Sequence, residues 1–383
     1  MKQGWEIKKL GEVCEVIGGS TPKTSDDTFW DGDYYWISPA ELDGSKYVYS
    51  TTRTITDAGV RSAHLQILPI GTVLLSSRAP IGKVAITKVP MYCNQGFKNL
   101  VCGKDLINEY VYWFLKHNTD YLNSLGTGAT FKEISKKVVE QIPIPVPPIA
   151  EQEKIVAELD CLSGIIEKKK QQLKELDNLA QSIFYEMFGD PVENDKGWEK
   201  KRLDEIGKVI TGNTPSTKDE SNYSSAAYCF IKPRDIAKDS KSYISNTEFY
   251  VSEKAYINSR QLPKGSVLTT CIGIIGKVGI LQKDATCNQQ INAIIPNKDI
   301  DAKFLAHVLF MIRDVLTDVA NAPIVPIINK KEFSSVSIPV PLFSLQQDFA
   351  SKIESIEKQK ELIAKSIKET ETLFNSRMDY YFN

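Results

Sequence analysis

The chain has 383 residues, of which 42% are hydrophobic and 25% are charged. This is the composition of a globular protein, and the length suggests two or three domains. The segment MKQGWEIKKL has no apolar core and no run of 18 apolar residues follows, so we expect neither a secretory signal nor a membrane span. A net charge of −1 excludes a simple polycation, and seven cysteines without a CxxC pair indicate reduced thiols in the cytoplasm.

The first predicted elements form a globular domain, which we place at residues 1–148. It opens with a polar Gly-Thr-Pro turn, IGGSTPKT, at 17–24. Short β-rich runs bounded by glycine and proline follow at 72–77 and 83–87, and an amphipathic helix is predicted at 107–118. This mixture predicts an α+β fold with a predominantly antiparallel or barrel-like sheet.

A long helix is predicted next, at 149–189. Prolines precede it, and Gly189-Asp190-Pro191 ends it. Its apolar residues recur at alternating steps of four and three, which is the spacing of a heptad seam. The residues expected to pair with another helix are Ile155, Leu159, Leu162, Ile166, Leu173, Leu176 and Ile183.

The second half of the chain repeats the first. The turn ITGNTPST at 210–217 matches 17–24, CNQ recurs at 93–95 and 287–289, and IPVP recurs at 144–147 and 338–341. So long a period indicates a duplicated domain rather than a solenoid. We therefore place a second domain at 190–341 and a second long helix at 342–383. Its seam residues are Ile353, Ile356, Ile363, Ile367 and Phe374.

The two helices are expected to pair antiparallel. A helix of ~40 residues is ~60 Å long, and a parallel pair would need the second domain to carry the chain back over that length. An antiparallel pair instead predicts domains at opposite ends, related by a pseudo-twofold axis. The alternative is that each helix packs only on its own domain.

Both Gly-Thr-Pro turns carry groups that contact nucleic acids. Gly19 and Gly212 can adopt positive φ angles, and Pro22 and Pro215 fix the next bend. Hydroxyl, amide and ammonium groups around them are those that bind phosphates and base edges. The DNA-binding candidates here are Ser20, Thr21, Lys23, Thr24, Asn213, Thr214, Ser216 and Lys218. A solvent-exposed turn without a partner is the alternative.

The repeated CNQ segments supply further candidates. Asparagine and glutamine can read adenine through two hydrogen bonds, although buried amides also tie down loops. The amide candidates are Asn94, Gln95, Asn288 and Gln289, and the cationic candidates are Arg78, Lys83, Lys98, Lys232, Arg234 and Lys277. The globular segments carry net charges of +1 and +3, which suit DNA binding if the cations gather on one face.

Catalytic motifs are not apparent in the sequence. GIIGKVGI at 273–280 lacks P-loop spacing and is better explained as a β-hairpin with glycine at the turn. The three histidines have no metal-ligand spacing, and no Asn/Asp-Pro-Pro-aromatic motif for base methylation occurs. We therefore expect no catalytic residue, metal or cofactor in this chain.

These segments together resemble the specificity (S) subunit of type I restriction-modification systems. The resemblance rests on GWEIKKLGEVCEVIGGSTPKT, YYWISPAELDG, SSRAPIGKVAI, CNQGFKNLV and IPIPVPPIAEQEKIVAELD, with weaker forms in the second half. It covers essentially the whole chain. It implies that each globular unit is a target recognition domain for one half of a bipartite, asymmetric DNA site, held apart from the other by the antiparallel helices.

The resemblance also implies the partners. These are double-stranded DNA, two methyltransferase (M) subunits docked on the helices, and restriction (R) subunits reached through the complex, all in the cytoplasm. S-adenosylmethionine, ATP and magnesium would belong to those subunits, and this chain would be non-catalytic. The alternative function is a coiled-coil scaffold whose globular domains bind ligands other than DNA.

Overall fold

The structure is a computed structural model that describes residues 4–78, 80–128, 132–320 and 325–383. It divides into two compact units. Unit 1 is formed by Met1–Lys170 and Lys365–Asn383, and unit 2 by Gln171–Ala364. Each unit contains one globular domain and part of each of two 40-residue helices, α6 (Ile149–Phe188) and α12 (Phe343–Phe382).

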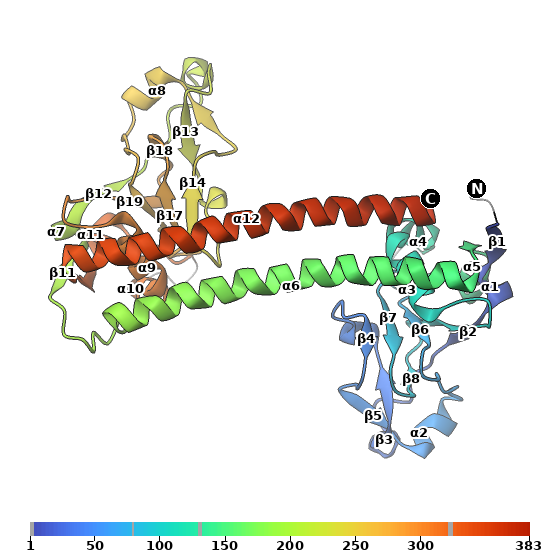
Figure 1. Ribbon diagram of the computed structural model, residues 1–383. Helices are drawn as coiled ribbons and strands as arrows, with labels where there is room; N and C mark the ends of the chain where they lie inside the picture. Colours follow the sequence, from blue (N-terminus) through green and yellow to red (C-terminus); the bar gives the residue numbers. More distant parts are fainter. Residues whose placement is uncertain (1–3, 79, 129–131, 321–324) are drawn as a thin grey trace. The chain divides into compact units, whose positions relative to one another are not determined.

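The globular domain of unit 1 is built on a five-stranded and a three-stranded sheet. The strand orders are β2-β9-β6-β7-β4 and β5-β3-β8, and β1 pairs with β10 separately. The smaller sheet lies on the far side of the larger sheet from α6 (Figure 1). The strands are β1 Glu6–Lys9, β2 Cys14–Gly18, β3 Trp30–Ile37, β4 Tyr47–Val48, β5 Arg53–Ile55, β6 Val73–Leu75, β7 Val84–Thr87, β8 Tyr92–Cys93, β9 Lys98–Cys102 and β10 Pro143–Val146.

Short helices complete this domain. The helix α3 confirms the amphipathic helix predicted from the sequence, and its consecutive residues from Tyr110 to Leu115 are buried in the core of unit 1. The helices are α1 Leu10–Val13, α2 Asp57–Ser62, α3 Asn108–His117, α4 Thr119–Leu125 and α5 Lys136–Glu140, with 3₁₀ turns η1 Asp27–Phe29 and η2 Pro39–Glu41.

Unit 2 repeats this plan, with strand orders β12-β19-β16-β17-β14 and β15-β13-β18 and a separate β11-β20 pair. Its strands are β11 Lys200–Arg202, β12 Gly207–Thr211, β13 Tyr228–Ile231, β14 Ser242–Ile244, β15 Tyr250–Val251, β16 Val267–Thr270, β17 Val278–Leu281, β18 Ala285–Cys287, β19 Ile291–Pro296 and β20 Ser337–Pro339. Its helices are α7 Leu203–Ile206, α8 Glu253–Ile257, α9 Ala302–Met311, α10 Arg313–Val319 and α11 Lys330–Ser335, with 3₁₀ turns η3 Glu220–Tyr223 and η4 Pro233–Asp235.

The predicted predominance of antiparallel pairing is confirmed in each unit. The parallel neighbours are β3 with β8 and β4 with β7 in unit 1, and β13 with β18 and β14 with β17 in unit 2. The segment GIIGKVGI begins in the turn of an antiparallel β16-β17 hairpin, as predicted, and Gly273 and Gly276 there have φ of 76° and 79°. The proline-rich segment before α6 is more than a connector, because β10 pairs with β1.

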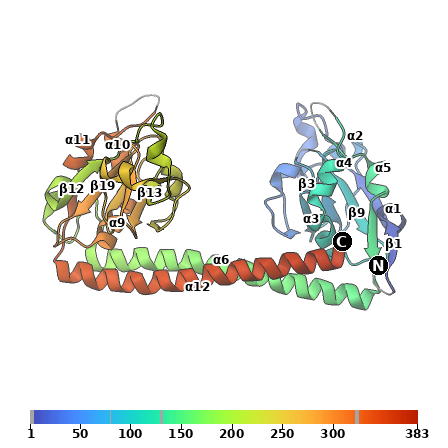
Figure 2. The same cartoon turned by 90° about the horizontal axis from the view of Figure 1, so that it is seen from above.

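The two long helices pair antiparallel within each unit. In unit 1, Glu158 of α6 accepts a hydrogen bond from Arg377 of α12 at 2.8 Å, and Lys170 pairs with Glu371 at 2.8 Å. In unit 2, Lys360 of α12 reaches Asp177 of α6 at 2.8 Å. As residue numbers rise along α6, the partner numbers on α12 fall. Figures 1 and 2 both draw these paired helix segments side by side.

All twelve residues predicted for the helix seam are buried or half-buried. Those that the structure buries fully are Ile155, Leu159, Ile353, Ile356 and Ile367. The heptad spacing does not, however, reveal that the helix ends also enter the domain cores. Phe184 and Phe188 of α6 pack on Phe304 and Phe349 inside unit 2.

A buried glutamine joins each long helix to its domain. In unit 1, the side chain of Gln152 accepts from the Ile107 N–H at 2.9 Å and donates to the carbonyl oxygen of Asp105 at 2.8 Å. In unit 2, Gln346 accepts from the Asp301 N–H at 2.9 Å. Because these amides satisfy backbone groups away from water, each helix start is held firmly on the loop before α3 or α9.

Candidate functional site

The structure brings the Gly-Thr-Pro turn and the CNQ segment together in each unit. In unit 1, the Ser20 N–H donates to the carbonyl oxygen of Cys93 at 3.0 Å, and the Thr21 hydroxyl donates to the amide oxygen of Gln95. In unit 2, the Asn213 N–H donates to Cys287 at 2.9 Å, and Thr214 donates to Gln289 at 2.7 Å. We call each hydroxyl–amide contact a Thr–Gln pair.

The glycines of these turns are required for close approach rather than for an unusual backbone angle. Gly19 and Gly212 do not use the positive φ angles open to glycine, since neither is among the positive-φ glycines. A Cβ at Gly19 would instead overlap the carbonyl oxygens of Cys93 and Asn94, and a Cβ at Gly212 would overlap the corresponding oxygens of the second CNQ segment. The missing side chain is what lets the two loops pack backbone to backbone.

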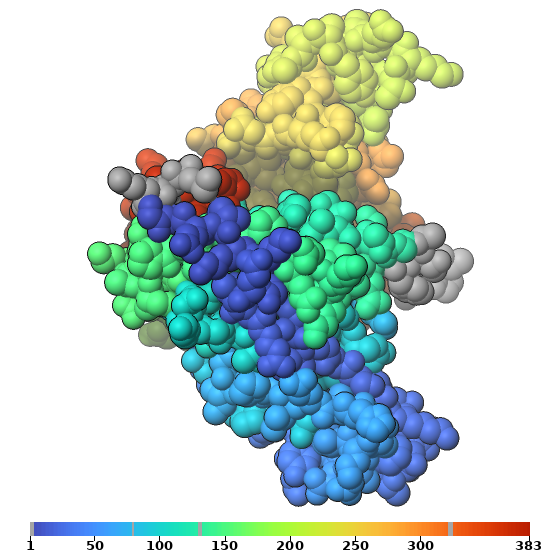
Figure 3. Space-filling model, turned by 90° about the vertical axis from the view of Figure 1, so that its right-hand side faces the viewer, coloured from blue at the N-terminus to red at the C-terminus, as the bar shows by residue number. Residues whose placement is uncertain are grey.

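Different side chains support the turn in the two units. In unit 1 the buried Trp36 and Trp30 donate their indole N–H groups to the carbonyl oxygens of Ser20 and Lys23, each at 3.2 Å. Both tryptophans belong to β3, which lies at the end of unit 1 farthest from α6. This end of unit 1 is coloured blue at the bottom of Figure 3.

In unit 2 the support comes from η3. The Tyr223 hydroxyl donates to the Pro215 carbonyl at 2.8 Å, and the Asn222 side chain donates to Ser216 at 3.0 Å. The Arg260 N–H also donates to the Asn213 side chain at 3.0 Å. Similar turns are therefore held in place by residues that the two units do not share.

The polar groups beyond each Thr–Gln pair face solvent. In unit 1, Gln95, Lys23 and Thr24 are exposed. In unit 2, Gln289, Thr214, Ser216 and Lys218 are exposed. Within the residues that the structure describes, neither Lys23 nor Lys218 pairs with a carboxylate, so both ammonium groups are free to bind an anion.

The CNQ asparagines act mainly on their own loops. Asn94 accepts from the Gly96 N–H at 2.9 Å, and Asn288 accepts from the Gln290 N–H at 3.1 Å. Asn288 is also buried. The geometry thus favours the loop-tying alternative for the asparagines and leaves the glutamines as the outward-facing amides.

A charged cluster adjoins the Thr–Gln pair in unit 1. Glu133 accepts from Arg78 at 2.9 Å and from Lys98 at 3.3 Å, and Lys98 also lies 3.5 Å from the Gln95 carbonyl oxygen. Although partial burial opposes the change, hydrogen bonds from the two cations lower the pKa of Glu133. Glu133 therefore stays ionised at neutral pH, and the guanidinium of Arg78 lies at the surface.

The remaining cationic candidates are used differently. Lys83 donates to the carbonyl oxygens of Pro39 and Leu42 at 3.2 and 2.8 Å, and Lys277 donates to Pro233 at 3.0 Å. These ammonium groups hold η2 and η4 in place, which makes them weak candidates for phosphate binding.

Two cations of unit 2 lie beside η4. Lys232 lies 3.2 Å from the centroid of the Phe249 ring, and Arg234, which is exposed, pairs with Glu248. Lys232 therefore packs within the domain, while the guanidinium of Arg234 keeps a solvent-facing side.

Sequence reasoning missed Glu133 and Arg260. They lie on loops without a repeated motif, far in sequence from the turns that they adjoin. The repeat offset of 194 does pair Glu133 with Ile327 and Arg78 with Ile272, so the alignment of the two halves contained this signal.

The described residues show neither a metal site nor a membrane span. No group of three or more His, Cys, Asp or Glu side chains there is arranged to hold a metal ion. No helix in the same residues is long and apolar enough to cross a membrane.

Comparison with known proteins places these features in a family. A family model described as "Type I restriction modification DNA specificity domain" matches twice, at residues 2–178 and 195–372. The type I restriction enzyme MjaIX specificity subunit of Methanocaldococcus jannaschii is 37% identical over 253 residues, which cover 61% of this chain and 58% of that protein. The EcoR124I/EcoR124II specificity subunit of Escherichia coli is 33% identical over 162 residues, or 40% of each chain.

The solved structures agree on the fold. The S subunit of a type I restriction-modification system from M. genitalium covers 100% of this chain and 98% of its own at a TM-score of 0.62, with 14% identity. This likeness concerns the fold alone. The chain spans about half the length of the curated relatives that it matches.

Proposed function

The chain belongs to the family defined by the type I restriction-modification DNA specificity domain, and we propose that it selects the DNA target of such a system. Each unit reads one half of a bipartite, asymmetric duplex sequence. The observation that carries the proposal is the Thr–Gln pair, which both units build at the same place with different neighbours. Shared geometry with different flanking residues is what two different half-sites require.

The chemistry of the Thr–Gln pair suits a base edge. The threonine hydroxyl occupies one lone pair of the glutamine oxygen, which orients the amide and leaves its NH₂ group and a second lone pair for a ligand. Glutamine with both groups available can bind adenine at N6 and N7 in the major groove. The exposed Lys23 and Lys218 are then placed to neutralise phosphates.

The long helices are the proposed docking site for two methyltransferase subunits, through which restriction subunits join. In this proposal the chain is non-catalytic and cytoplasmic. S-adenosylmethionine, ATP and magnesium are bound by the partner subunits, which carry out the chemistry on the DNA that this chain has selected.

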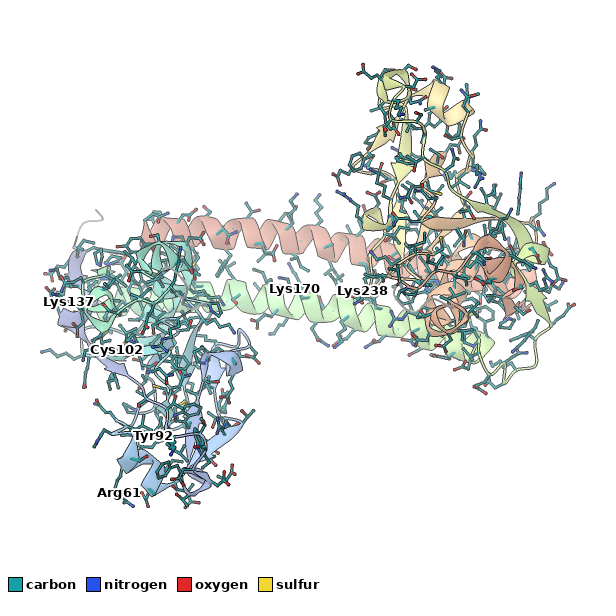
Figure 4. The ribbon with its side chains drawn as sticks, turned by 180° about the vertical axis from the view of Figure 1, so that it is seen from behind. Arg61, Tyr92, Cys102, Lys137, Lys170 and Lys238 are labelled. Carbon is teal, nitrogen blue, oxygen red and sulfur yellow. The ribbon has the colours of Figure 1, made fainter. Side chains whose placement is uncertain are left out.

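Binding by the assembled complex tests the proposal. We expect Lys23→Gln and Lys218→Gln each to weaken binding to the target duplex several-fold and to reduce the slope of log K against log salt by about 0.9, the value for one phosphate contact. Lys137→Gln is the matched control. This exposed lysine lies on α5 near α6, at the end of unit 1 opposite to the end that Arg61 and Tyr92 mark in Figure 4. An unchanged slope in both variants would remove these turns from the DNA contact.

A second measurement separates this function from a scaffold. Binding should require both half-sites at one fixed spacing, because two recognition units on one chain have a limited reach. Equal affinity for random duplex DNA and for every spacing would favour the scaffold instead.

A further inference from the structure

The two units place different side chains on one shared backbone arrangement next to the Thr–Gln pair. In unit 1, Arg78 and Glu133 face each other across an isolated antiparallel bridge, and the Ile134 N–H donates to Ser77 at 2.9 Å. In unit 2, Ile272 and Ile327 form the corresponding bridge, and the Ile328 N–H donates to Cys271 at 3.0 Å. Residues directly opposite in such a bridge lie on the same face.

The bridge of unit 2 therefore presents an apolar patch where unit 1 presents charges. Ile327 is 44% exposed and Ile274 is 53% exposed. The residues before them are bonded to each other, because the Gly273 N–H donates to the Pro326 carbonyl oxygen at 3.0 Å. Ile272 is half-buried and packs on the core of unit 2 below them. We call Ile272, Ile274 and Ile327 the isoleucine patch.

The isoleucine patch is continuous with the proposed DNA surface. The Cys271 N–H donates to the Gln290 carbonyl at 2.9 Å, so the strand end that carries Ile272 is bonded to the residue after Gln289 of the Thr–Gln pair. Arg313 lies against Gly276 of the same loop, and the exposed Lys330 follows Ile327 by three residues.

We propose that the isoleucine patch recognises the 5-methyl group of thymine in the half-site read by unit 2. This rests on the proposed function. In the major groove, thymine is the base that offers a methyl group, and apolar side chains are its usual contacts. The corresponding place in unit 1, with its Arg78 guanidinium, would instead favour a hydrogen-bond acceptor such as guanine.

A protein partner fits the patch less well. A specific protein interface covers ~800 Å² on each side, far more than three isoleucine side chains provide. A methyltransferase subunit that docks equivalently on both units would also need surfaces that the units share, and this surface is one where they differ most.

Uracil substitution tests the proposal in the complex with its methyltransferase subunits. The target is first read from genomic methylation, and the half belonging to unit 2 is assigned with Gln289→Ala. Thymines of that half are then replaced by uracil, which lacks only the methyl group. We expect binding to weaken about three- to five-fold for each methyl group contacted.

Variants connect this loss to the patch. The double variant Ile274→Ser with Ile327→Ser should bind thymine and uracil duplexes equally, and both positions are exposed enough to tolerate serine. Ile70→Ser, which changes an exposed isoleucine of unit 1 (63% exposed), should keep the wild-type preference.

Three results would overturn the inference: a unit 2 half-site without an A·T pair, a double variant that keeps the preference for thymine, or a double variant whose only defect is loss of the methyltransferase subunits. The last would assign the patch to a protein partner. A wild-type complex that binds no duplex sequence-specifically would instead contradict the proposed function itself.

Discussion

At the scale of single residues, a glycine of the Gly-Thr-Pro turn is required because of its contact with the CNQ segment, which is distant in sequence. Gly19 matters because the backbone of Cys93 and Asn94 lies where its side chain would be. The neighbouring Gly18, in β2, has open space around the corresponding position. Two adjacent glycines of one motif thus have different structural importance.

We expect Gly19→Ala to lower the free energy of unfolding of the chain by about 1–3 kcal/mol, because a methyl group there forces apart two backbone segments. Gly18→Ala should change it by less than about 0.5 kcal/mol. Urea unfolding followed by tryptophan fluorescence measures both, since Trp30 and Trp36 support this turn. Equal effects from the two substitutions would contradict the close-approach explanation.

At the scale of elements, the long helices combine an apolar seam with specific polar contacts. Lys169 of α6 reaches Thr370 of α12 at 3.4 Å in unit 1, and Lys360 of α12 reaches Asp177 in unit 2. A polar residue within an apolar seam costs some stability but favours one register and orientation. These lysines, which occupy positions of the heptad seam that are otherwise mostly apolar, therefore help to define the antiparallel pairing.

The contact of Glu158 with Arg377 makes the helix pair of unit 1 sensitive to acid. The hydrogen bond from Arg377 lowers the pKa of Glu158, against the effect of partial burial and together with a hydrogen bond from Tyr381. A carboxylate with a lowered folded-state pKa stabilises the fold above its unfolded pKa, near 4.3, and this contribution disappears as pH falls through the lowered value.

We therefore expect Glu158→Gln to reduce the free energy of unfolding by about 1 kcal/mol or less at pH 7, since the pair is partly exposed. The difference from wild type should narrow steadily between pH 5 and pH 3. Urea midpoints across this range provide the measurement, with the exposed Glu153→Gln on the same helix as control. A difference that stays constant as the pH falls would show that packing, not charge, is responsible.

At the scale of the whole molecule, the duplication separates two tasks. The features that the units share, namely the strand order, the buried glutamine and the Thr–Gln pair, build and orient the proposed recognition surface. The features that differ, such as Arg78 against Ile272, lie beside that surface. Under the proposed function, a chain organised in this way would change one half of its specificity without disturbing the other.

Gln95→Ala and Gln289→Ala should therefore each relax the sequence requirement in one half-site only. A well-formed pair of hydrogen bonds to a base contributes ~1–3 kcal/mol of discrimination, or about 5- to 150-fold. Sequencing of adenine methylation in cells that carry each variant with its partner subunits is the measurement, and Gln171→Ala on α6 is an exposed control. Changes in the same half from both variants would rule out one half-site for each unit.

Much of the architecture is predictable from the sequence alone. The repeat offset indicates two similar domains, and the alternating steps of four and three locate both long helices, whose observed bounds are Ile149–Phe188 and Phe343–Phe382. These features depend on periodicity and on internal repetition, which are properties of the chain as written. The turn motifs and CNQ segments are visible for the same reason.

The tertiary structure alone decides how those motifs act. Thr21 and Gln95 are 74 residues apart and Arg78 and Glu133 are 55 apart, and no local pattern connects them. Only the folded sheets bring such loops together, and only their packing shows that Lys83 and Lys277 are held by carbonyl groups inside the domain. Sequence determines the elements because they follow local periodicity, whereas the recognition surface depends on contacts between loops that have none.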